Sequence, residues 1–233
     1  MKKLNIAIIG LGNIGSYLFK FLKKNKNILS KKNNCIPNVI YLSAKKIGKK
    51  RGFKISKKIW LKNYLDATKK KDVDLIIELI GGAEGPAKKL VFNALKNKKH
   101  VVTANKALIA KYGDELSKIA ERNNVNLEFE AAVCGGVPII RSLKEGLIAN
   151  KIKKIYGIFN GTSNYILSSM QKDNKNFNVV LEKAKNLGYA ESNPSADLNG
   201  DDVASKLKIL SSLCFNSYLN NDIHVEGINN IDK

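Results

Sequence analysis

The sequence LNIAIIGLGNIGSYLFKFLKK, residues 4–24, decides the fold class. Its start, LNIAIIG, is an apolar run that predicts a buried strand, and SYLFKFLKK predicts an amphipathic helix. Between them lies the pattern G-x-G-x-x-G, formed by Gly10, Gly12 and Gly15 together with Asn13 and Ile14. The first glycine allows a tight turn, the second lets the backbone approach a pyrophosphate, and the third lets helix and strand pack closely. In this context the pattern predicts a nucleotide-phosphate site at a helix N-terminus.

The chain beyond this turn keeps alternating strand-like and helix-like segments. These segments are VDLIIELIGG (73–82), EGPAKKLVFNALKNKK (84–99), HVVTANKALIA (100–110) and NVNLEFEAAVCGGVPIIRSLKEGL (124–147). The alternation predicts an α/β fold with a doubly wound, parallel Rossmann-type sheet over residues 1–132.

The choice of cofactor depends on the end of the second expected strand, VIYLSAKK (39–46). An NAD enzyme usually places an Asp or Glu there, against the ribose 2′-hydroxyl, and this segment contains no acid. Lys45 and Lys46 stand in its place, and their charge favours the 2′-phosphate of NADP. NAD remains the alternative, because lysine is common throughout the chain and a loop expected over residues 25–38 blurs the alignment.

A second informative stretch is AKNLGYAESNPSADLNGDDVASK, residues 184–206, which crowds acids around a proline and a glycine. The acids are Glu191, Asp197, Asp201 and Asp202. We expect Asn199 or Asp201 to cap a helix that begins at Asp202, on which Asp202 and Lys206 lie side by side at i and i+4. An active site explains this density of charge. The alternative is a surface loop followed by a helix with an ordinary ion pair.

Residues 152–170, which end in KIYGIFNGTSNYILSSM, predict a strand, a glycine turn and a helix. Either Thr162 or Ser163 is expected to cap the start of that helix. Capping alone would explain these residues as well as a place beside a ligand does.

Residues 184–206 resemble the signature of the homoserine dehydrogenases. The positions that carry the resemblance are, in order, Ala184, Gly188, Tyr189, Ala190, Asn193, Pro194, Asp197, Leu198, Gly200, Asp202 and Lys206. The segments GG (81–82), TANK (103–106), FEAAVCGGVPII (129–140) and NGTSNYIL (160–167) are also similar to the family's. The resemblance implies NAD(P)-dependent interconversion of L-aspartate 4-semialdehyde and L-homoserine, a step of threonine and methionine biosynthesis.

The resemblance also implies roles for individual residues. Lys206 would exchange the proton with the substrate oxygen, Asp202 would bind substrate and orient Lys206, and Lys106 would lie near nicotinamide and substrate. Glu191 would hold the substrate's amino group. Asp197, Gly161 and Thr162 would complete the substrate shell. The residues implied to bind the cofactor are Gly10, Gly12, Asn13, Ile14, Gly15, Lys45, Gly81, Thr103, Lys106 and Gly188.

Two further implications concern a cation and the rest of the protein. Family members hold a monovalent cation on backbone carbonyls, which here would belong to Glu130, Val133, Gly135 and Val137. Carbonyl oxygens suit a hard cation such as sodium. A strand-to-helix turn explains the glycines of that segment equally well. Members are usually homo-oligomers and continue well beyond the point that corresponds to Lys233. The resemblance therefore implies that residues 133–233 form a partial α+β substrate or catalytic domain, truncated at its C-terminus. We expect either a fragment or a minimal form completed by a partner, and in both cases the usual interface region is missing.

Composition bounds the other classes of function. The chain has 41 basic and 20 acidic side chains, a net charge of +21, yet only three of the basic residues are arginines. Lysine excess without arginines and aromatics along one face does not favour a specific nucleic-acid reader. A DNA-binding redox sensor would have no need of Glu191, Asp202 and Lys206, and a catalytically silent scaffold could have lost them. Another NAD(P)-dependent amino-acid dehydrogenase is the nearer alternative.

The cysteines and the N-terminus bear on the compartment. Cys35, Cys134 and Cys214 are isolated and odd in number, which supports neither a disulfide framework nor a zinc site. MKKLNIAIIG begins like a signal peptide, but the glycines interrupt the apolar run and no small-residue cleavage site follows. No stretch approaches the roughly 20 apolar residues of a membrane span. We expect a soluble cytoplasmic protein with a small-molecule substrate.

Overall fold

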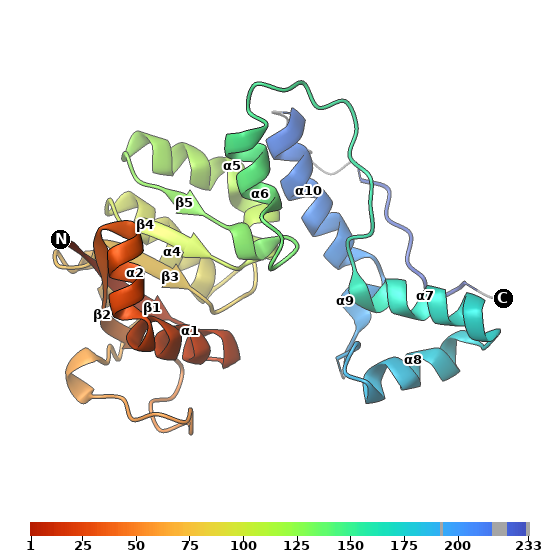
Figure 1. Cartoon of the computed structure of the whole chain (residues 1–233), viewed down its shortest axis with the longest axis horizontal. Coiled ribbons are helices and arrows are strands. Elements are labelled where there is room, and N and C mark those ends of the chain that lie inside the picture. The colour runs from red at the N-terminus through yellow and green to blue at the C-terminus, as the bar shows by residue number, and fades with distance from the viewer. Residues whose placement is uncertain (192, 216–222, 232–233) are drawn as a thin grey trace. The chain divides into compact units, whose positions relative to one another are not determined.

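A computed structural model of the chain describes residues 1–191, 193–215 and 223–231. The chain divides into two compact units, Met1–Pro138 and Ile139–Lys233. Each unit has its own elements, which Figure 1 shows along the chain from red to blue.

The first unit is built on a parallel sheet with the strand order β2-β1-β3-β4-β5 (Figure 1). The strands are β1 (Lys2–Ile9), β2 (Cys35–Ser43), β3 (Leu75–Glu78), β4 (His100–Thr103) and β5 (Leu127–Glu128). The expected doubly wound α/β fold is therefore confirmed. Since β1 pairs with both β2 and β3, the strand order reverses there, and ligands of such sheets bind beyond the carboxyl ends of the strands at that point.

Register fixes which residues meet at this carboxyl edge. Ile9 pairs with Ser43 on one side and with Glu78 on the other, and Glu78 in turn pairs with Thr103. The chain leaves the sheet after each of these residues. The segments that follow the four strand ends are therefore brought to one edge although they are far apart in sequence.

The helices of the first unit cover this sheet. They are α1 (Asn13–Lys24), α2 (Lys26–Asn33), the short η1 (Lys57–Ile59), α3 (Asp66–Lys69), α4 (Pro86–Lys96), α5 (Lys106–Arg122) and η2 (Glu130–Ala132). Buried side chains of β1, including Ile6 and Ile8, form a core with Leu42 and Ile77. The loop expected over residues 25–38 is wrong, because α2 fills most of it and Asn34 ends that helix in a left-handed conformation.

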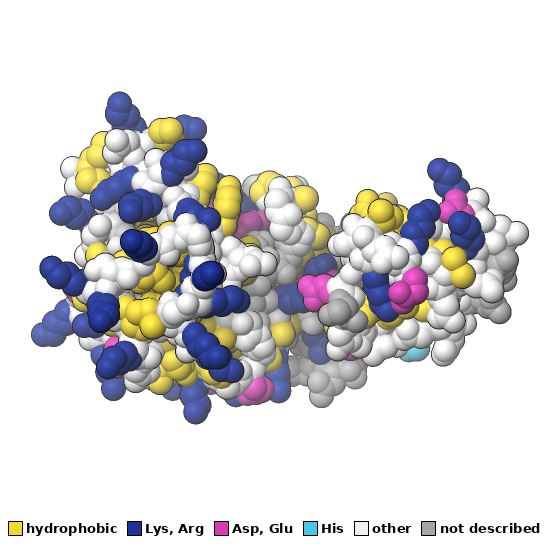
Figure 2. All heavy atoms as spheres, turned by 90° about the horizontal axis from the view of Figure 1, so that it is seen from below, with side chains coloured by type: hydrophobic (Ala, Val, Ile, Leu, Met, Phe, Trp, Pro, Cys, Tyr) yellow, Lys and Arg dark blue, Asp and Glu magenta, His cyan; other side chains and the backbone are white. Residues whose placement is uncertain are grey.

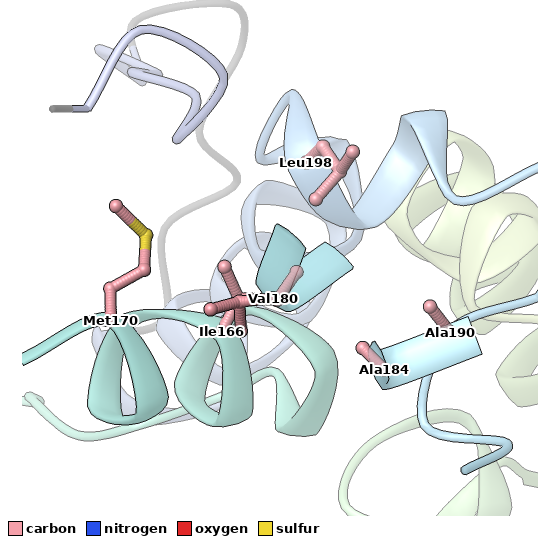
Figure 3. Close-up of a cluster of buried hydrophobic side chains, with 6 residues drawn as sticks. All are labelled: Ile166, Met170, Val180, Ala184, Ala190 and Leu198. Carbon is pink, nitrogen blue, oxygen red and sulfur yellow. The ribbon is translucent and has the colours of Figure 1, made fainter. Parts of the chain in front are cut away.

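The described elements of the second unit are helices. They are α6 (Ile139–Arg141), the π-helical η3 (Ser142–Gly146), α7 (Gly161–Asp173), α8 (Phe177–Asn186), α9 (Ser195–Leu198) and α10 (Asp201–Phe215). Ile166 and Met170 of α7 pack with Val180 and Ala184 of α8 (Figure 3). Leu198 of α9 closes this cluster, so the packing of α7 and α8 also fixes the segment that carries the acids.

The strand expected before Gly161 is wrong, since residues 151–160 have no regular secondary structure. A strand needs a neighbour to bond its amides and carbonyls, and no strand is present among the described residues of this unit. Tyr156 and Ile158 of this segment are exposed. The strand predicted near residue 127 does form, but it is reduced to Leu127–Glu128.

Three further features complete the description. On the face shown in Figure 2, Lys and Arg side chains are scattered over the first unit and do not line a single groove. Among the described helices, none combines the length and apolarity that crossing a bilayer requires. Cys35, Cys134 and Cys214 are not joined in disulfides.

Candidate functional site

Gly10, Gly12 and Gly15 of the first turn have different structural roles. Gly10 has φ +105°, and a Cβ there would lie 2.4 Å from the Leu79 carbonyl oxygen. A Cβ on Gly15 would lie 2.0 Å from the Gly10 carbonyl oxygen, so only glycine lets α1 approach β1 this closely. A Cβ on Gly12 would meet no heavy atom within 4 Å. Gly12 therefore borders open space at the start of α1, and this space fits a pyrophosphate better than it fits a packing requirement.

The start of α1 is suited to an anion. Gly12 precedes the helix, and within the part of the chain that the structure describes no side chain caps its first amides. Asn13 and Ile14, the first two residues of α1, are exposed. The amides at an uncapped helix start are available to a phosphate group, which the helix dipole also favours.

A basic cavity of about 340 Å³ adjoins the glycine turn. Its lining combines Gly12 and residues of α1 with four cationic side chains: Lys20, Lys49, Lys50 and Arg51. Arg51 donates to the carbonyl oxygens of Leu11 at 3.1 Å and Lys46 at 2.6 Å, and so ties the segment after β2 to the glycine turn. Lys45 lies exposed just beyond the end of β2. Sequence reasoning missed Arg51, whose signal was a lone arginine within a lysine-rich segment.

The exits of β3 and β4 are joined by a buried carboxylate. Glu78 is fully buried and accepts hydrogen bonds from the amides of Ile80 at 2.7 Å and Gly81 at 3.0 Å. Its other oxygen accepts the hydroxyl of Thr103 at 2.5 Å. Sequence reasoning treated Glu78 only as part of a buried strand, although a lone acid in such a run is a signal for a satisfied polar group.

Lys106 follows this arrangement directly. Asn105 caps α5 by accepting the amide of Leu108, and its side chain also donates to the Gly82 carbonyl at 2.7 Å. Lys106 is therefore the first residue of α5 and is half-buried. The structure thus brings the predicted residues Gly81, Thr103 and Lys106 to the same sheet edge as the glycine turn.

In the second unit, Lys206 and Asp202 form a buried ion pair on α10. The Lys206 Nζ lies 2.7 Å from Asp202 Oδ2, and the two side chains are 16% and 3% exposed. Lys206 also donates to the carbonyl oxygen of Phe159 at 2.6 Å. The alternative of an ordinary surface ion pair is therefore wrong, because both side chains are largely buried and Lys206 also has a backbone acceptor.

Asn160 links this pair to Asp197. Its side-chain amide donates to Asp197 Oδ1 at 2.7 Å and to Asp202 Oδ2 at 2.9 Å. We call Asn160, Asp197, Asp202 and Lys206 the carboxylate cluster. Sequence reasoning missed Asn160, which stood in the quoted segment directly before Gly161.

The expected caps at this cluster are wrong. Asn160 caps α7 by accepting the amide of Ser163 at 2.8 Å, because its extended backbone places the side chain over the first turn. Thr162 instead lies with its hydroxyl 2.7 Å from the Tyr189 carbonyl oxygen and 3.0 Å from Asp197 Oδ2. The Ser163 hydroxyl donates to the Asp197 carbonyl oxygen. Helix α7 therefore contacts the acidic segment at several points.

At the second helix start, α10 begins at Asp201 and follows Gly200, whose carbonyl accepts the amide of Ala204. Neither expected cap, Asn199 or Asp201, occupies the capping position. The Asn199 side chain accepts a hydrogen bond from Asn229 at 2.8 Å instead. Asn229, which lies far along the chain, thus binds the Asn199 side chain that a local pattern would assign to the helix cap.

The other predicted positions are not hydrogen-bonded to the carboxylate cluster in the described part of the chain, or carry backbone roles. Glu191 is exposed, and among the described residues it makes no hydrogen bond to that cluster. Gly161 is the first residue of α7, and Gly188 has φ +79° just after α8. Of the four predicted cation ligands, Glu130 and Val133 are at least half-buried, while Gly135 and Val137 are exposed.

Comparison with known proteins identifies both units. Residues 10–130 match the family model described as "Homoserine dehydrogenase, NAD binding domain", and residues 138–233 match the model described as "Homoserine dehydrogenase". The homoserine dehydrogenase of Neisseria gonorrhoeae is 42% identical over 236 residues, and that of Bacillus subtilis is 40% identical over 232. These alignments cover 100% and 99% of this chain but 53% of each relative.

Solved structures agree with the sequence comparisons. The crystal structure of a homoserine dehydrogenase from Thiobacillus denitrificans has a TM-score of 0.91 and 39% identity, covering 100% of this chain and 54% of that one. A hyperthermophilic archaeal homoserine dehydrogenase in complex with NADPH has a TM-score of 0.80 and 28% identity, and the match covers 93% of this chain and 71% of that one.

The sheet order, the glycine turn and these matches place the first unit among NAD-binding domains of the Rossmann type, joined to a catalytic domain. The chain belongs to the homoserine dehydrogenase family. It spans about half the length of the curated relatives that it matches.

Proposed function

We propose that this protein catalyses the NAD(P)-dependent interconversion of L-homoserine and L-aspartate 4-semialdehyde. The observation that carries the proposal is the carboxylate cluster, in which a lysine is held by a buried carboxylate inside a unit that matches the family. A bound nicotinamide dinucleotide would supply the hydride acceptor or donor. The chain's own residues bind the substrate and move the proton.

In homoserine oxidation, the C4–H bond breaks with its electron pair leaving as hydride, and the hydroxyl proton must leave separately. Lys206 takes that proton as a neutral amine and returns it when the aldehyde is reduced. Asp202 and the Phe159 carbonyl fix the Nζ from two sides, so the lysine stem cannot swing away. The substrate's ammonium group is a cation, and Asp197 and Glu191 supply the negative charge that would hold it.

The remaining predicted residues complete this assignment. Gly161 and Thr162 at the start of α7 shape the substrate side, and Thr162 does so through its contact with Asp197. Lys106, with the strand exits at Gly81 and Thr103, is proposed to bind the cofactor in the first unit. Gly188, with φ +79°, follows the end of α8 and is proposed as a further cofactor-binding residue.

The test is the absorbance of NADPH at 340 nm with aspartate 4-semialdehyde, and the reverse reaction with homoserine. Lys206→Met keeps the aliphatic stem but cannot exchange a proton, and we expect it to lose at least about 100-fold in kcat, the usual contribution of general acid–base catalysis. Lys208→Ala, on the same helix, is the matched control. Turnover that survives in Lys206→Met would contradict the mechanism. Faster turnover of other amino-acid alcohols would favour another amino-acid dehydrogenase, and cofactor binding without turnover would favour a dinucleotide sensor.

We further propose NADP as the preferred cofactor. No acid stands directly at the end of β2, Lys45 is exposed there, and the adjoining cavity is lined by Lys49, Lys50 and Arg51. A 2′-phosphate adds negative charge that such a lining attracts. The NADPH in the archaeal relative's structure is consistent with this choice. We expect Lys45→Ala to weaken NADPH binding more than NADH binding, and equal effects on both would refute the assignment.

We also propose a monovalent cation, sodium, on the carbonyl oxygens of Glu130, Val133, Gly135 and Val137. The backbone supports such a site, since Cys134 with φ +49° and Gly136 with φ +92° turn the chain tightly between these residues. Carbonyl oxygens suit a hard cation. Thermal unfolding in sodium chloride and in choline chloride at equal ionic strength tests the site. A higher Tm in sodium is expected, and equal values would reject it.

A further inference from the structure

Asn160 occupies a buried position between two acids. It is 7% exposed, and its single amide group donates to Asp197 at 2.7 Å and to Asp202 at 2.9 Å. Its carbonyl oxygen is used separately, because it accepts the amide of Ser163 and caps α7. The two ends of one side chain thus serve two different purposes, one for the helix and one for the acids.

A neutral donor is the appropriate group for this position. Asp202 is 4% exposed, and a buried carboxylate is costly unless it is hydrogen-bonded. The Asn160 amide donates one hydrogen bond to each acid without adding a charge. A lysine there would neutralise the negative charge that Lys206 and the substrate's ammonium group require, and an aspartate would repel both neighbours.

The link to Lys206 runs through one oxygen atom. Asp202 Oδ2 accepts from the Asn160 amide and also lies 2.7 Å from Lys206 Nζ. The same Nζ donates to the carbonyl of Phe159, the residue just before Asn160. An ammonium group has three N–H donors, and in the described part of the chain these contacts use two, which leaves one that could reach a substrate oxygen.

We propose that Asn160 is a positioning residue that holds Asp202, and through it Lys206, in the arrangement needed for proton transfer. The inference rests on the proposed function. Removal of the Asn160 amide leaves more of the Asp202 charge to the Lys206 ammonium, which then holds its proton more tightly. The other titratable side chains around the neighbouring cavity are Asp197, His224 and Glu226.

Asn160→Ser is the informative variant, because serine can still cap α7 while it lacks the amide. Asn164→Ser makes the same chemical change at an exposed position one turn further along α7. We expect Asn160→Ser to keep wild-type helix content by circular dichroism. We also expect the alkaline rise of the kcat for homoserine oxidation to move to higher pH, with the KM for the cofactor unchanged. Each pH unit of that movement lowers kcat about tenfold below the midpoint.

A second measurement does not depend on turnover. In the full chain labelled with ¹³Cε-lysine, the Lys206 resonance is assigned by its loss in Lys206→Arg and then titrated. The midpoint is expected to rise in Asn160→Ser and to stay in place in Asn164→Ser. An unchanged midpoint in Asn160→Ser overturns the inference even if the enzyme is active. A raised midpoint in a chain that oxidises no homoserine supports the coupling and refutes the proposed function instead.

Discussion

Replacing Gly227 by alanine should loosen the acidic segment of the second unit. A Cβ at this position would lie 2.7 Å from the Leu198 carbonyl oxygen and 3.0 Å from Asn199 Cα, whereas ordinary contact begins at 3.4 Å. Both obstacles are backbone, so the C-terminal segment must retreat by several tenths of an ångström. The retreat weakens the 2.8 Å hydrogen bond from the Ile228 amide to the Leu198 carbonyl.

The expected loss follows from these two effects. Overpacking of this kind costs about 1–3 kcal/mol, and weakening the hydrogen bond adds a fraction of the roughly 1 kcal/mol that such a bond contributes. We expect the free energy of unfolding of the second unit to fall by about 2 kcal/mol. Gly146→Ala is the matched control, because a Cβ at Gly146 meets no heavy atom within 4 Å.

Urea unfolding separates the two units without a further label. The single tryptophan, Trp60, belongs to the first unit, so its fluorescence follows that unit while circular dichroism also follows the helices of the second. We expect Gly227→Ala to move the circular dichroism transition to lower urea and leave the fluorescence transition in place. A circular dichroism curve that superimposes on the wild type, or on Gly146→Ala, would refute the close-approach reasoning.

Three other perturbations test separate parts of the structure. Glu78→Ala removes the acceptor of Thr103 and of two amides at the exit of β3, and should lower the stability of the first unit by about 2 kcal/mol and weaken cofactor binding, as followed by calorimetry and NADPH fluorescence. The hydrogen bond from Lys111 lowers the pKa of Glu84 from 4.5 to about 2. The Glu84 carboxylate therefore stabilises the folded chain above pH 4.5, and this stabilisation is lost as the pH falls towards 2. The difference in unfolding free energy between wild type and Glu84→Gln should shrink over that pH range, and also in high salt. Ile166→Ala empties a fully buried position in the core of α7 and α8 and should cost about 2–5 kcal/mol in urea unfolding.

The order of elements and the cofactor turn were predictable because their signals are local. The glycine pattern marks a tight turn and a helix start within one short segment, and the structure gives Gly10 a positive φ and Gly15 a close approach, as the pattern predicts. The pairing of Asp202 with Lys206 was equally local, because residues at i and i+4 on one helix always adjoin. Whether that pair was exposed or buried was not decided by spacing.

The predictions of helix caps and of one strand were wrong where the choice between neighbouring residues depends on contacts with distant parts of the chain. Thr162 and Ser163 are good capping residues by type, yet Asn160 caps α7 because its backbone is extended there. Asn199 could have capped α10, but its side chain meets Asn229. The strand expected before Gly161 failed for the same kind of reason, since a strand forms only beside a partner.

The sequence by itself determined the doubly wound fold, the glycine turn, the family and most of the candidate residues, because periodicity, glycine constraints and signature spacing are written along the chain. Only the tertiary structure decided how Asn160, Asp197 and Asp202 meet, and that Glu78 joins the exits of β3 and β4. These residues come from separate elements. Their distances are set by the packing of α7, α9 and α10 and by the register of the sheet, and no local pattern encodes either.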